Sequence, residues 1–400
     1  MIKFKQIFKR AAKEKRLTKL DISVTLSLVL LLISSCIMVY SATMIGNKYG
    51  MFTNGIPVSS NYFLIRQSVW AIVSLVAFLF FSIVPYEIFK NRTYYSYGFL
   101  IIAVLLIIPR FGSSVNGAYS WINIGGFTFQ PSVLAQIFVI AYMALILEAR
   151  KEILRRPTKP TVLVKIFAIP IAILGLIFTQ NDTGTMLITI AVVIIIMLCA
   201  NISFRNIMFL VKVGIGSLIG LAFVIYIRGL ISGGAAYQLD RIQTFFDPFA
   251  GTSNSNEHII NSMISFGNGG LFGKGLGNSI QKLGYLPEAH TDFILAITAE
   301  EFGFMGVVVV VTLLTIIITK ILYTGLNSGR TFESIFSLGF AALLFTQTMV
   351  NIGGISAALP MTGVPIPFYS FGGSSMFVLS ATLGIVMNLL SHIKYVKGSN

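Results

Sequence analysis

The sequence has few charged residues. Of its 400 residues only 11% are Asp, Glu, Lys or Arg, whereas 55% are hydrophobic. Soluble domains carry roughly 25% charged residues, so this composition excludes an ordinary soluble protein. Repeated apolar runs of about 20 residues instead predict an all-α polytopic membrane protein, because each run is long enough to cross a bilayer as a helix.

Cysteines and acidic residues are also scarce. The two cysteines, Cys36 and Cys199, lie inside apolar runs and indicate neither a disulfide framework nor a metal site. The formal net charge is +15, but no nucleic-acid-binding motif or aromatic-interleaved basic patch accompanies it, so no nucleic acid is expected as a partner. The lysine- and arginine-rich tail at 1–21 is expected to lie on anionic lipid headgroups.

Ten apolar segments fit membrane-spanning helices, at about 22–45, 62–84, 94–109, 131–149, 162–179, 184–200, 207–229, 291–319, 335–355 and 372–393. An even number puts both termini on one side of the membrane. The connections on that side hold most of the lysines and arginines, which predicts that both termini are cytoplasmic. The basic residues assigned to the outer side are Lys48, Arg66, Arg110, Arg228, Arg241, Lys274 and Lys282.

The ten segments are predicted to form one membrane domain, 22–393, between cytoplasmic tails at 1–21 and 394–400. The one long connection is an extracytoplasmic loop at about 230–290, between the seventh and eighth helices. A loop of that length inside a compact protein is usually functional.

Two short outer segments carry polar residues at membrane depth, where such residues are costly without a purpose. The first runs from Asn116 to Trp121 and on to Gln130, Pro131 and Ser132, where Pro131 suits the first turn of a helix. Trp121 fits either an anchor at headgroup level or a site residue. Asp182, in the second segment, fits either the N-cap of the sixth helix or a site residue.

A glycine-rich run occupies 267–277 of the long loop. It is not a phosphate-binding P-loop, because the required Gly-x4-Gly-Lys-Ser/Thr spacing would place glycine at 268 and Ser or Thr at 275, where the chain has Asn268 and Gly275. Glycine nonetheless lets backbone N–H groups approach an anion, and Lys274 and Lys282 add charge. The run therefore fits a phosphate-bearing ligand, with a merely flexible loop as the alternative.

Two further outer segments follow. Glu288, His290 and Asp292 fall within five residues and lead directly into the eighth helix. Between 359 and 375, three prolines and paired glycines break the chain near the outer leaflet. Broken backbone at that depth survives only where protein or a cavity satisfies it, so this segment is predicted to be a re-entrant element that lines a site.

Together these motifs resemble the SEDS family of bacterial shape, elongation, division and sporulation proteins. The resemblance runs from the first span to the last, and its most specific parts are 116–121, 130–132, 241–248, 273–293 and 360–375. The stretch 275–290 is more similar to the FtsW and SpoVE branch than to the RodA branch.

The resemblance implies a ten-span peptidoglycan glycosyltransferase in the bacterial plasma membrane. Such proteins polymerise lipid II, a disaccharide-pentapeptide on undecaprenyl pyrophosphate, at the outer face. They act with a class B penicillin-binding protein, which crosslinks the glycan. Other division proteins and membrane lipids are further implied partners, and the division septum is the implied location. The family's essential aspartate falls on Asp292.

The sequence departs from the family pattern in two places. A Gln-Pro-Ser-Glu motif ends in Val133 here, and the Lys expected three residues later is Gln136. Losing both members of a charged pair is cheaper than losing one, so the fold should survive, but a catalytic role of that pair cannot be carried over. The family's Gln-Pro-Asp has Asn181 in the middle and retains Asp182.

The implied reaction needs a base for the incoming sugar hydroxyl and stabilisation for a departing pyrophosphate. Asp292 is the candidate base, but a helix N-terminus favours its ionised form and leaves it weakly basic. Three solutions stay open: proton removal coupled to bond formation, a pKa raised by the pyrophosphate, or a divalent cation (Mg²⁺ or Mn²⁺) bound partly by Asp292. No other cofactor is expected.

The candidate substrate-binding residues come from all the outer segments. Arg241, Lys274 and Lys282 are the candidates for pyrophosphate contacts. The others are Gln281, Glu288, His290, Thr291, Asn116, Trp121, Asp182, Ser370 and Ser374. Glu288 and His290 fit loop-capping roles equally well, and Glu300 and Glu301 fit buried ion pairs instead of substrate contacts.

Two other functions stay open. A lipid II flippase would use broken helices and intramembrane polar residues equally well, although it needs a polar path through the bilayer and the acids and glycines concentrate outside. A noncatalytic division scaffold would only recruit the penicillin-binding protein. The His-Thr-Asp motif argues against it, while Val133 and Gln136 leave it open. The sequence does not decide between septal and lateral growth.

Overall fold

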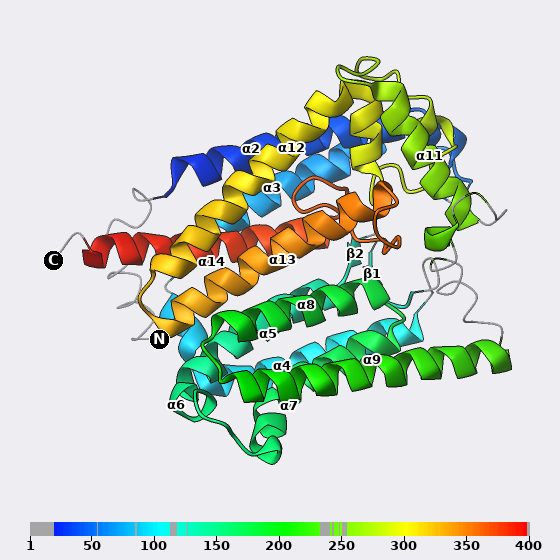
Figure 1. The fold of residues 1–400 in the computed structure, drawn as a ribbon. Helices are drawn as coiled ribbons and strands as arrows, with labels where there is room; N and C mark the ends of the chain where they lie inside the picture. The colour runs from blue at the N-terminus through cyan, green and yellow to red at the C-terminus, as the bar shows by residue number, and fades with distance from the viewer. Residues whose placement is uncertain are drawn as a thin grey trace.

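The chain forms a bundle of long helices. The computed structural model describes residues 20–53, 55–84, 86–112, 118–125, 127–232, 241, 244–247, 249 and 254–397. The long helices are α2 (Ile22–Thr43), α3 (Tyr62–Ile83), α4 (Arg92–Ile107), α5 (Pro131–Ala149), α7 (Pro160–Thr179), α8 (Thr183–Cys199), α9 (Phe204–Ser232), α12 (Ile294–Asn327), α13 (Thr331–Ile355) and α14 (Gly373–Lys397). All ten predicted apolar segments are therefore helical (Figure 1).

These helices make the chain a multi-pass membrane protein. Within the described residues, eight are long and apolar enough to cross a membrane, namely all of the long helices except α8 and α9. The apolar helix α8 is shorter, with 17 residues. The number of ten spans stays a prediction, and so does the side on which the termini lie.

Among the eight candidate spans, helices α13 and α14 are the most buried. Helix α14 packs along α3, α13 packs against α5 and α8, and α12 contacts α13, α2 and α11 (Asn254–Gly269). By contrast, α3 and α4 expose apolar side chains such as Ile72 and Leu100. Exposed apolar faces on helices of this length fit contact with lipid, because lipid tails satisfy them as well as a core does.

The irregular segments gather at one end of the bundle. Helix α11, the hairpin of β1 (Ile122–Ile124) and β2 (Phe127–Phe129), and the segment before α14 lie at the right in Figure 1, opposite the start of α2 and the end of α14. The hairpin is antiparallel, with Ile122 opposite Phe129. Neither the hairpin nor α11 was predicted. The remaining short elements are α6 (Lys151–Leu154), η2 (Gly46–Tyr49), η3 (Tyr86–Lys90), η4 (Ile108–Phe111) and η5 (Gln281–Leu283).

Helix α12 is longer than predicted and is kinked at Gly303, which has φ 68° and ψ −168°. The kink frees backbone groups on both sides, and residues 269–275, which we call the strap, pair with them. The N–H groups of Lys274 and Gly275 donate to the carbonyls of Glu300 and Glu301, at 3.0 and 2.9 Å. In return, the Phe304 N–H donates to the Gly270 carbonyl at 2.9 Å. Buried backbone groups need such partners.

This pairing gives glycines of the run a role that we did not predict, and the approach to an anion stays a prediction. A Cβ on Gly273 would lie 2.2 Å from the Glu301 carbonyl oxygen, and one on Gly269 would lie 1.8 Å from the Ala299 oxygen. The glycines are therefore needed for close contact between two backbones. Glycine is the residue that allows such an approach, and from sequence alone the two uses look the same.

Candidate functional site

A cavity of about 170 Å³ lies among the irregular segments. Its walls come from five separate parts of the chain, which the bundle brings together. The lining residues are Ala118, Ser120, Trp121, Gln130, Asn181, Asp182, Thr183, Gly184, Arg241, Glu288, Thr291, Asp292, Thr362, Gly363, Pro365, Phe371, Gly372 and Ser375. Five of these belong to the broken segment before α14, so this segment lines a cavity, and its role as a re-entrant element of a functional site stays a prediction.

Asp292 is held in the cavity wall by its backbone. It lies two residues before α12, whose N-cap is Phe293. The Asn351 side chain, from α13, donates from Nδ2 to the carbonyls of both Asp292 and Val364, each at 2.8 Å. The Phe371 N–H donates to the His290 carbonyl at 2.9 Å. Helix α13 and the broken segment therefore hold the backbone at Asp292 and at His290.

The surroundings of Asp292 make it a better base than the sequence predicts. Burial raises the pKa of its carboxyl, and the negative charges of Glu288 and Asp182 raise it further, against the opposing effect of Arg241, to about 7. We expected the helix N-terminus to favour the ionised form. Burial and two neighbouring carboxylates outweigh that effect, because both disfavour a further negative charge.

Arg241 and Asp292 both line the cavity and both lie close to Gly363. A Cβ built on Gly363 would lie 3.3 Å from Asp292 Oδ2 and 3.5 Å from Arg241 Nη2. The absence of a side chain at Gly363 therefore leaves space beside both groups. The site thus combines a basic oxygen with a fixed positive charge.

Asp182 both caps a helix and lines the cavity. Its Oδ1 accepts from the Thr185 N–H at 3.0 Å, which confirms the N-cap interpretation. Its Oδ2 accepts from Gln130 Nε2 at 3.1 Å and lies 3.4 Å from Ser132 Oγ. The two interpretations of Asp182 are therefore compatible.

Two cavity residues have backbone conformations that side chains rarely adopt. Glu288 has φ 54° and Asn181 has φ 61°. The Thr291 hydroxyl donates to Glu288 Oε2 at 2.8 Å, so Glu288 has a loop-capping contact as well as a place in the wall. Such conformations cluster at functional sites, where the surrounding structure maintains them.

His290, Ser370 and Ser374 support the wall without lining the cavity. The His290 ring packs against Phe52, Phe63 and Phe371, with ring centroids 4.7, 4.8 and 5.4 Å away. Burial lowers the pKa of His290 to about 4, so the ring is neutral near pH 7.

Ser370 and Ser374 accept backbone hydrogen bonds. Ser370 Oγ accepts from the Ile366 N–H at 2.9 Å, and Ser374 Oγ accepts from the Gln130 N–H at 3.2 Å. Both hydroxyls therefore hold the broken segment and the start of α5 in place.

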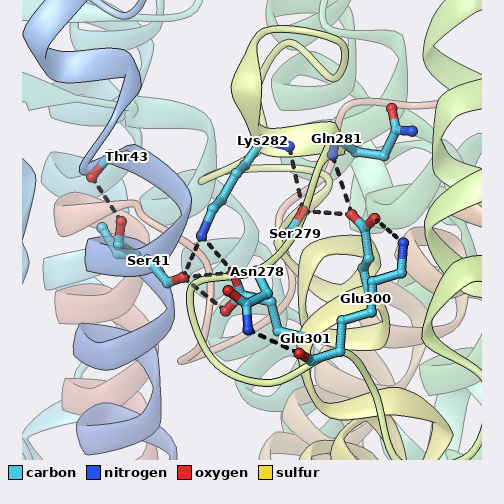
Figure 2. A network of polar contacts seen from close by, with 10 residues as sticks. Ser41, Thr43, Asn278, Ser279, Gln281, Lys282, Glu300 and Glu301 are labelled. Carbon is cyan, nitrogen blue, oxygen red and sulfur yellow. Dashed lines mark hydrogen bonds and ion pairs between the residues drawn. The ribbon is translucent and has the colours of Figure 1, made fainter.

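Lys274, Lys282 and Gln281 are not among the lining residues, so the pyrophosphate contacts expected of the two lysines and the substrate contact expected of Gln281 stay predictions. Lys282 is buried, and its Nζ lies 2.7 Å from Glu301 Oε1 (Figure 2). Lys274 Nζ lies 3.5 Å from Glu300 Oε1. These contacts confirm the ion-pair interpretation of Glu300 and Glu301. Gln281 donates its backbone N–H to Glu300 Oε2 at 3.2 Å.

The positions that depart from the family pattern form an uncharged network. Gln136 Nε2 donates to Thr189 Oγ1 at 3.2 Å and lies 3.3 Å from the Thr185 carbonyl. Gln347 donates to Gln136 Oε1 at 3.4 Å. Neutral side chains from three helices therefore hydrogen-bond at Gln136, one of the two positions where the resemblance led us to expect a charged pair. Asn116 lies outside the described residues.

Sequence reasoning missed Gln130, Asn351 and Gly363 as site residues. Gln130 stands in a motif that the sequence does reveal, and Asn351 is a polar residue inside an apolar helix, which is itself a signal of function. Nothing in the sequence marks Gly363 among the other glycines. In the described part of the chain no group of three or more His, Cys, Asp or Glu side chains could hold a metal ion, and the cation hypothesis stays a prediction.

Comparisons with known proteins agree over nearly the whole chain. The family model for cell cycle proteins of the FtsW, RodA and SpoVE type matches residues 22–395. A protein of Bacillus subtilis named probable peptidoglycan glycosyltransferase FtsW is 34% identical over 392 residues, 96% of this chain and 93% of that protein. Stage V sporulation protein E of the same organism is 32% identical, over 94% of this chain and 99% of its own length.

Solved structures show the same fold. The crystal structure of the rod shape determining protein RodA of Thermus thermophilus matches with a TM-score of 0.63 and 23% identity, over 93% of this chain and 96% of that one. A chain from a structure titled "Structural coordination of polymerization and crosslinking by a peptidoglycan synthase complex" matches with a TM-score of 0.67 and 22% identity, over 94% and 98%.

Proposed function

Because the chain belongs to the FtsW, RodA and SpoVE family of cell cycle proteins, we propose that it is a peptidoglycan glycosyltransferase that polymerises lipid II at the outer face of the plasma membrane. Relatives named probable peptidoglycan glycosyltransferase match this chain over nearly their full length. The observation that carries the proposal for this chain is the pairing of Asp292 and Arg241 on one cavity beside Gly363.

The two side chains match the two demands of glycosyl transfer. The 4-hydroxyl oxygen of the incoming lipid II attacks the anomeric carbon of the growing glycan, and Asp292 takes the hydroxyl proton. The bond between that carbon and the pyrophosphate oxygen breaks, and its electron pair leaves with the lipid pyrophosphate. Arg241 offsets the charge of the departing group, as guanidinium groups do for phosphates.

The pKa of Asp292 suits this role. A general base works best when its pKa lies near the operating pH, because it is then both ionised and basic enough to take a proton. A pKa of about 7 meets that condition, whereas an ordinary aspartate near about 3.9 does not. Binding of the anionic pyrophosphate raises the pKa of Asp292 further, by the same repulsion that Glu288 and Asp182 exert.

The proposal includes a partner and a place. A class B penicillin-binding protein would crosslink the new glycan, and the similarity to FtsW and to stage V sporulation protein E favours division over lateral growth. The irregular end of the bundle would face outward, since lipid II is polymerised outside the cell. Binding of the purified partner and localisation of a tagged chain test these two points.

The decisive experiment gives fluorescent lipid II to the purified protein, with and without its penicillin-binding partner, and separates the products by length. We expect glycan ladders from the wild type and none from Asp292→Asn or Arg241→Gln. Glu257→Gln, which removes an exposed carboxylate on α11, is the matched control and should make normal ladders. Ladders of normal length from Asp292→Asn would refute the role of this carboxylate.

A transport assay separates the proposal from a flippase. Vesicles that contain the wild type should not move labelled lipid II between leaflets faster than empty vesicles. Fast movement together with absent ladders, with partner and Mg²⁺ supplied, would overturn the glycosyltransferase proposal in favour of transport.

A further inference from the structure

The loop that carries Asp292 is closed at its base by buried charges. Lys282 and Glu301 stand at the two ends of a segment whose middle holds Glu288 and Asp292. Lys282 Nζ lies 2.7 Å from Glu301 Oε1, and Ser41 Oγ, from α2, lies 2.7 Å from both carboxylate oxygens of Glu301. Lys282 also donates to Ser41 Oγ at 3.0 Å (Figure 2). We call Ser41, Lys282 and Glu301 the clamp.

A second set of contacts holds the neighbouring residue. Glu300 accepts from the Ser279 hydroxyl, from the Gln281 N–H at 3.2 Å and from Asn268 Nδ2 at 3.3 Å. Lys274 supplies its opposite charge. Two adjacent carboxylates, both 0% exposed, are therefore each matched by a lysine, as burial of charge requires.

The clamp acts on the segment of α12 that follows Asp292 directly. This segment runs from Ile294 to the kink at Gly303, and the strap fixes its far end through the Glu300 and Glu301 carbonyls. Ser41 attaches the same end to α2. The first turns of α12 are thus held at one end by the clamp and the strap, and they present Asp292 at the other end.

We propose that Ser41, Lys282 and Glu301 are positioning residues that set the place of Asp292 relative to Arg241. The inference rests on the proposed function of Asp292 as the base. None of the three lines the cavity, so they act through the loop and not on the substrate. Loss of the clamp should lower kcat and leave KM for lipid II nearly unchanged, because substrate contacts on the other walls remain.

Kinetics of polymerisation test this prediction. For Glu301→Gln we expect kcat to fall by roughly tenfold to a hundredfold, the loss typical of a small misplacement, with KM within about twofold of wild type. Glu257→Gln, an exposed acid on α11, is the matched control. Lys282→Met/Glu301→Met removes both charges and should fold better than either single variant, because neither charge is then left unpaired.

A distance measurement tests the clamp without relying on activity. Spin labels are placed at Tyr285 in the loop and Ile65 on α3, both exposed, after replacement of Cys36 and Cys199 by Ser. Wild type should give one narrow distance distribution and Glu301→Gln a broader or shifted one. If the wild type makes no polymer, the proposed function is refuted. The distance distributions then still show whether the clamp holds the loop in place.

Two outcomes would overturn the proposal. One is an unchanged distance distribution in folded Glu301→Gln and in the double variant. The other is a loss of activity that appears in KM alone, which would mean that these residues contribute to substrate binding. If Glu301→Gln does not fold, the kinetics and the distances are measured on Lys282→Met/Glu301→Met instead.

Discussion

At the scale of single residues, the raised pKa of Asp292 links catalysis to stability. The folded state holds the Asp292 proton more tightly than the unfolded state, whose pKa is near 3.8. The stability from that proton is complete in acid and is lost as the pH rises through about 7. Asp292→Asn is neutral at every pH and should therefore be more stable than wild type near pH 8.

The gain in unfolding free energy of Asp292→Asn over wild type is at most about 4 kcal/mol, from the difference between a pKa of 3.8 and one of about 7. Thermal unfolding in detergent at pH 5, 6, 7 and 8 measures it, with Glu257→Gln as control. The difference between variant and wild type should grow with pH and level off above about 7. A difference that is constant across this range would mean that Asp292 is not a shifted carboxyl.

The rate of polymerisation should follow the same ionisation. We expect kcat/KM of the wild type to rise with pH and to reach half its maximum near pH 7, because only ionised Asp292 accepts the hydroxyl proton. Ladder formation at fixed lipid II concentration from pH 5.5 to 8.5 measures the profile. A rate that is constant across this range would indicate an ordinary aspartate, which is already ionised at pH 5.5.

Substitution of Gly363 tests whether the space beside Asp292 and Arg241 is needed for activity. Gly363→Ala would put a methyl group 3.3 Å from Asp292 Oδ2 and 3.5 Å from Arg241 Nη2, and we expect at least a tenfold loss of polymerisation. Gly329→Ala is the matched control. Gly329 has φ 69° against 70° for Gly363, and a Cβ there meets nothing within 4 Å. Equal losses in both variants would attribute the effect to backbone strain.

At the residue scale the sequence predicted several residues that line the cavity, but it did not predict the ion pairs of the two lysines. Motifs led to Asp292, Arg241, Asp182, Glu288 and Trp121, which do line one cavity. The sequence did not pair Lys274 with Glu300 or Lys282 with Glu301, because these glutamates come from another element. A charge in a loop can be assigned only when the charges that face it in the fold are known.

At the scale of elements, the strap and the kink of α12 depend on each other. The apolar pattern predicted an uninterrupted helix, because a single glycine inside a helical pattern is tolerated and does not announce a kink. Here Gly303 breaks the helix and the strap supplies the missing backbone partners. Each feature supplies hydrogen-bond partners to the other, and these two stretches of the chain are not adjacent in sequence, so neither could be predicted alone.

Two alanine substitutions in the strap separate close packing from backbone strain. Gly273 and Gly270 both have positive φ, 78° and 53°. A Cβ on Gly273 would lie 2.2 Å from the Glu301 carbonyl oxygen, whereas one on Gly270 meets nothing within 4 Å. Gly270→Ala should cost about 1 kcal/mol of unfolding free energy, and Gly273→Ala clearly more. Thermal unfolding in detergent measures both, and similar losses would show that the close contact is unimportant.

At the scale of the whole molecule, hydropathy located every long helix but not what joins them. The helix ranges agree because about 20 apolar residues leave few other structures possible in a bilayer. The hairpin of β1 and β2 has three-residue strands, too short for a periodic signal. Helix α11 is polar and lies in the long loop. Most residues that line the cavity lie in other connections, at 118–121, 181–182, 288–292 and 362–372, so its geometry required the structure.

Orientation of the whole bundle can be tested by chemical labelling. The charge asymmetry predicts that the end with the cavity faces outward. On a Cys36→Ser/Cys199→Ser background, Tyr285→Cys should react with a membrane-impermeant maleimide in intact cells whose wall has been removed. Arg156→Cys, exposed in the connection between α6 and α7, should react only after permeabilisation. The reverse pattern would invert the topology.

The contact between Ser41 and Glu301 has a consequence for how the protein is made. The two residues are 260 positions apart in the chain. Ser35, whose hydroxyl donates a hydrogen bond to the Tyr369 carbonyl, is 334 positions from its partner. At about 5–20 residues per second of synthesis, the first helix waits roughly 10–50 s in the membrane for its partner on α12. A chain interrupted before residue 301 lacks the partner of Ser41, so the contact between α2 and α12 can form only after most of the chain has been made.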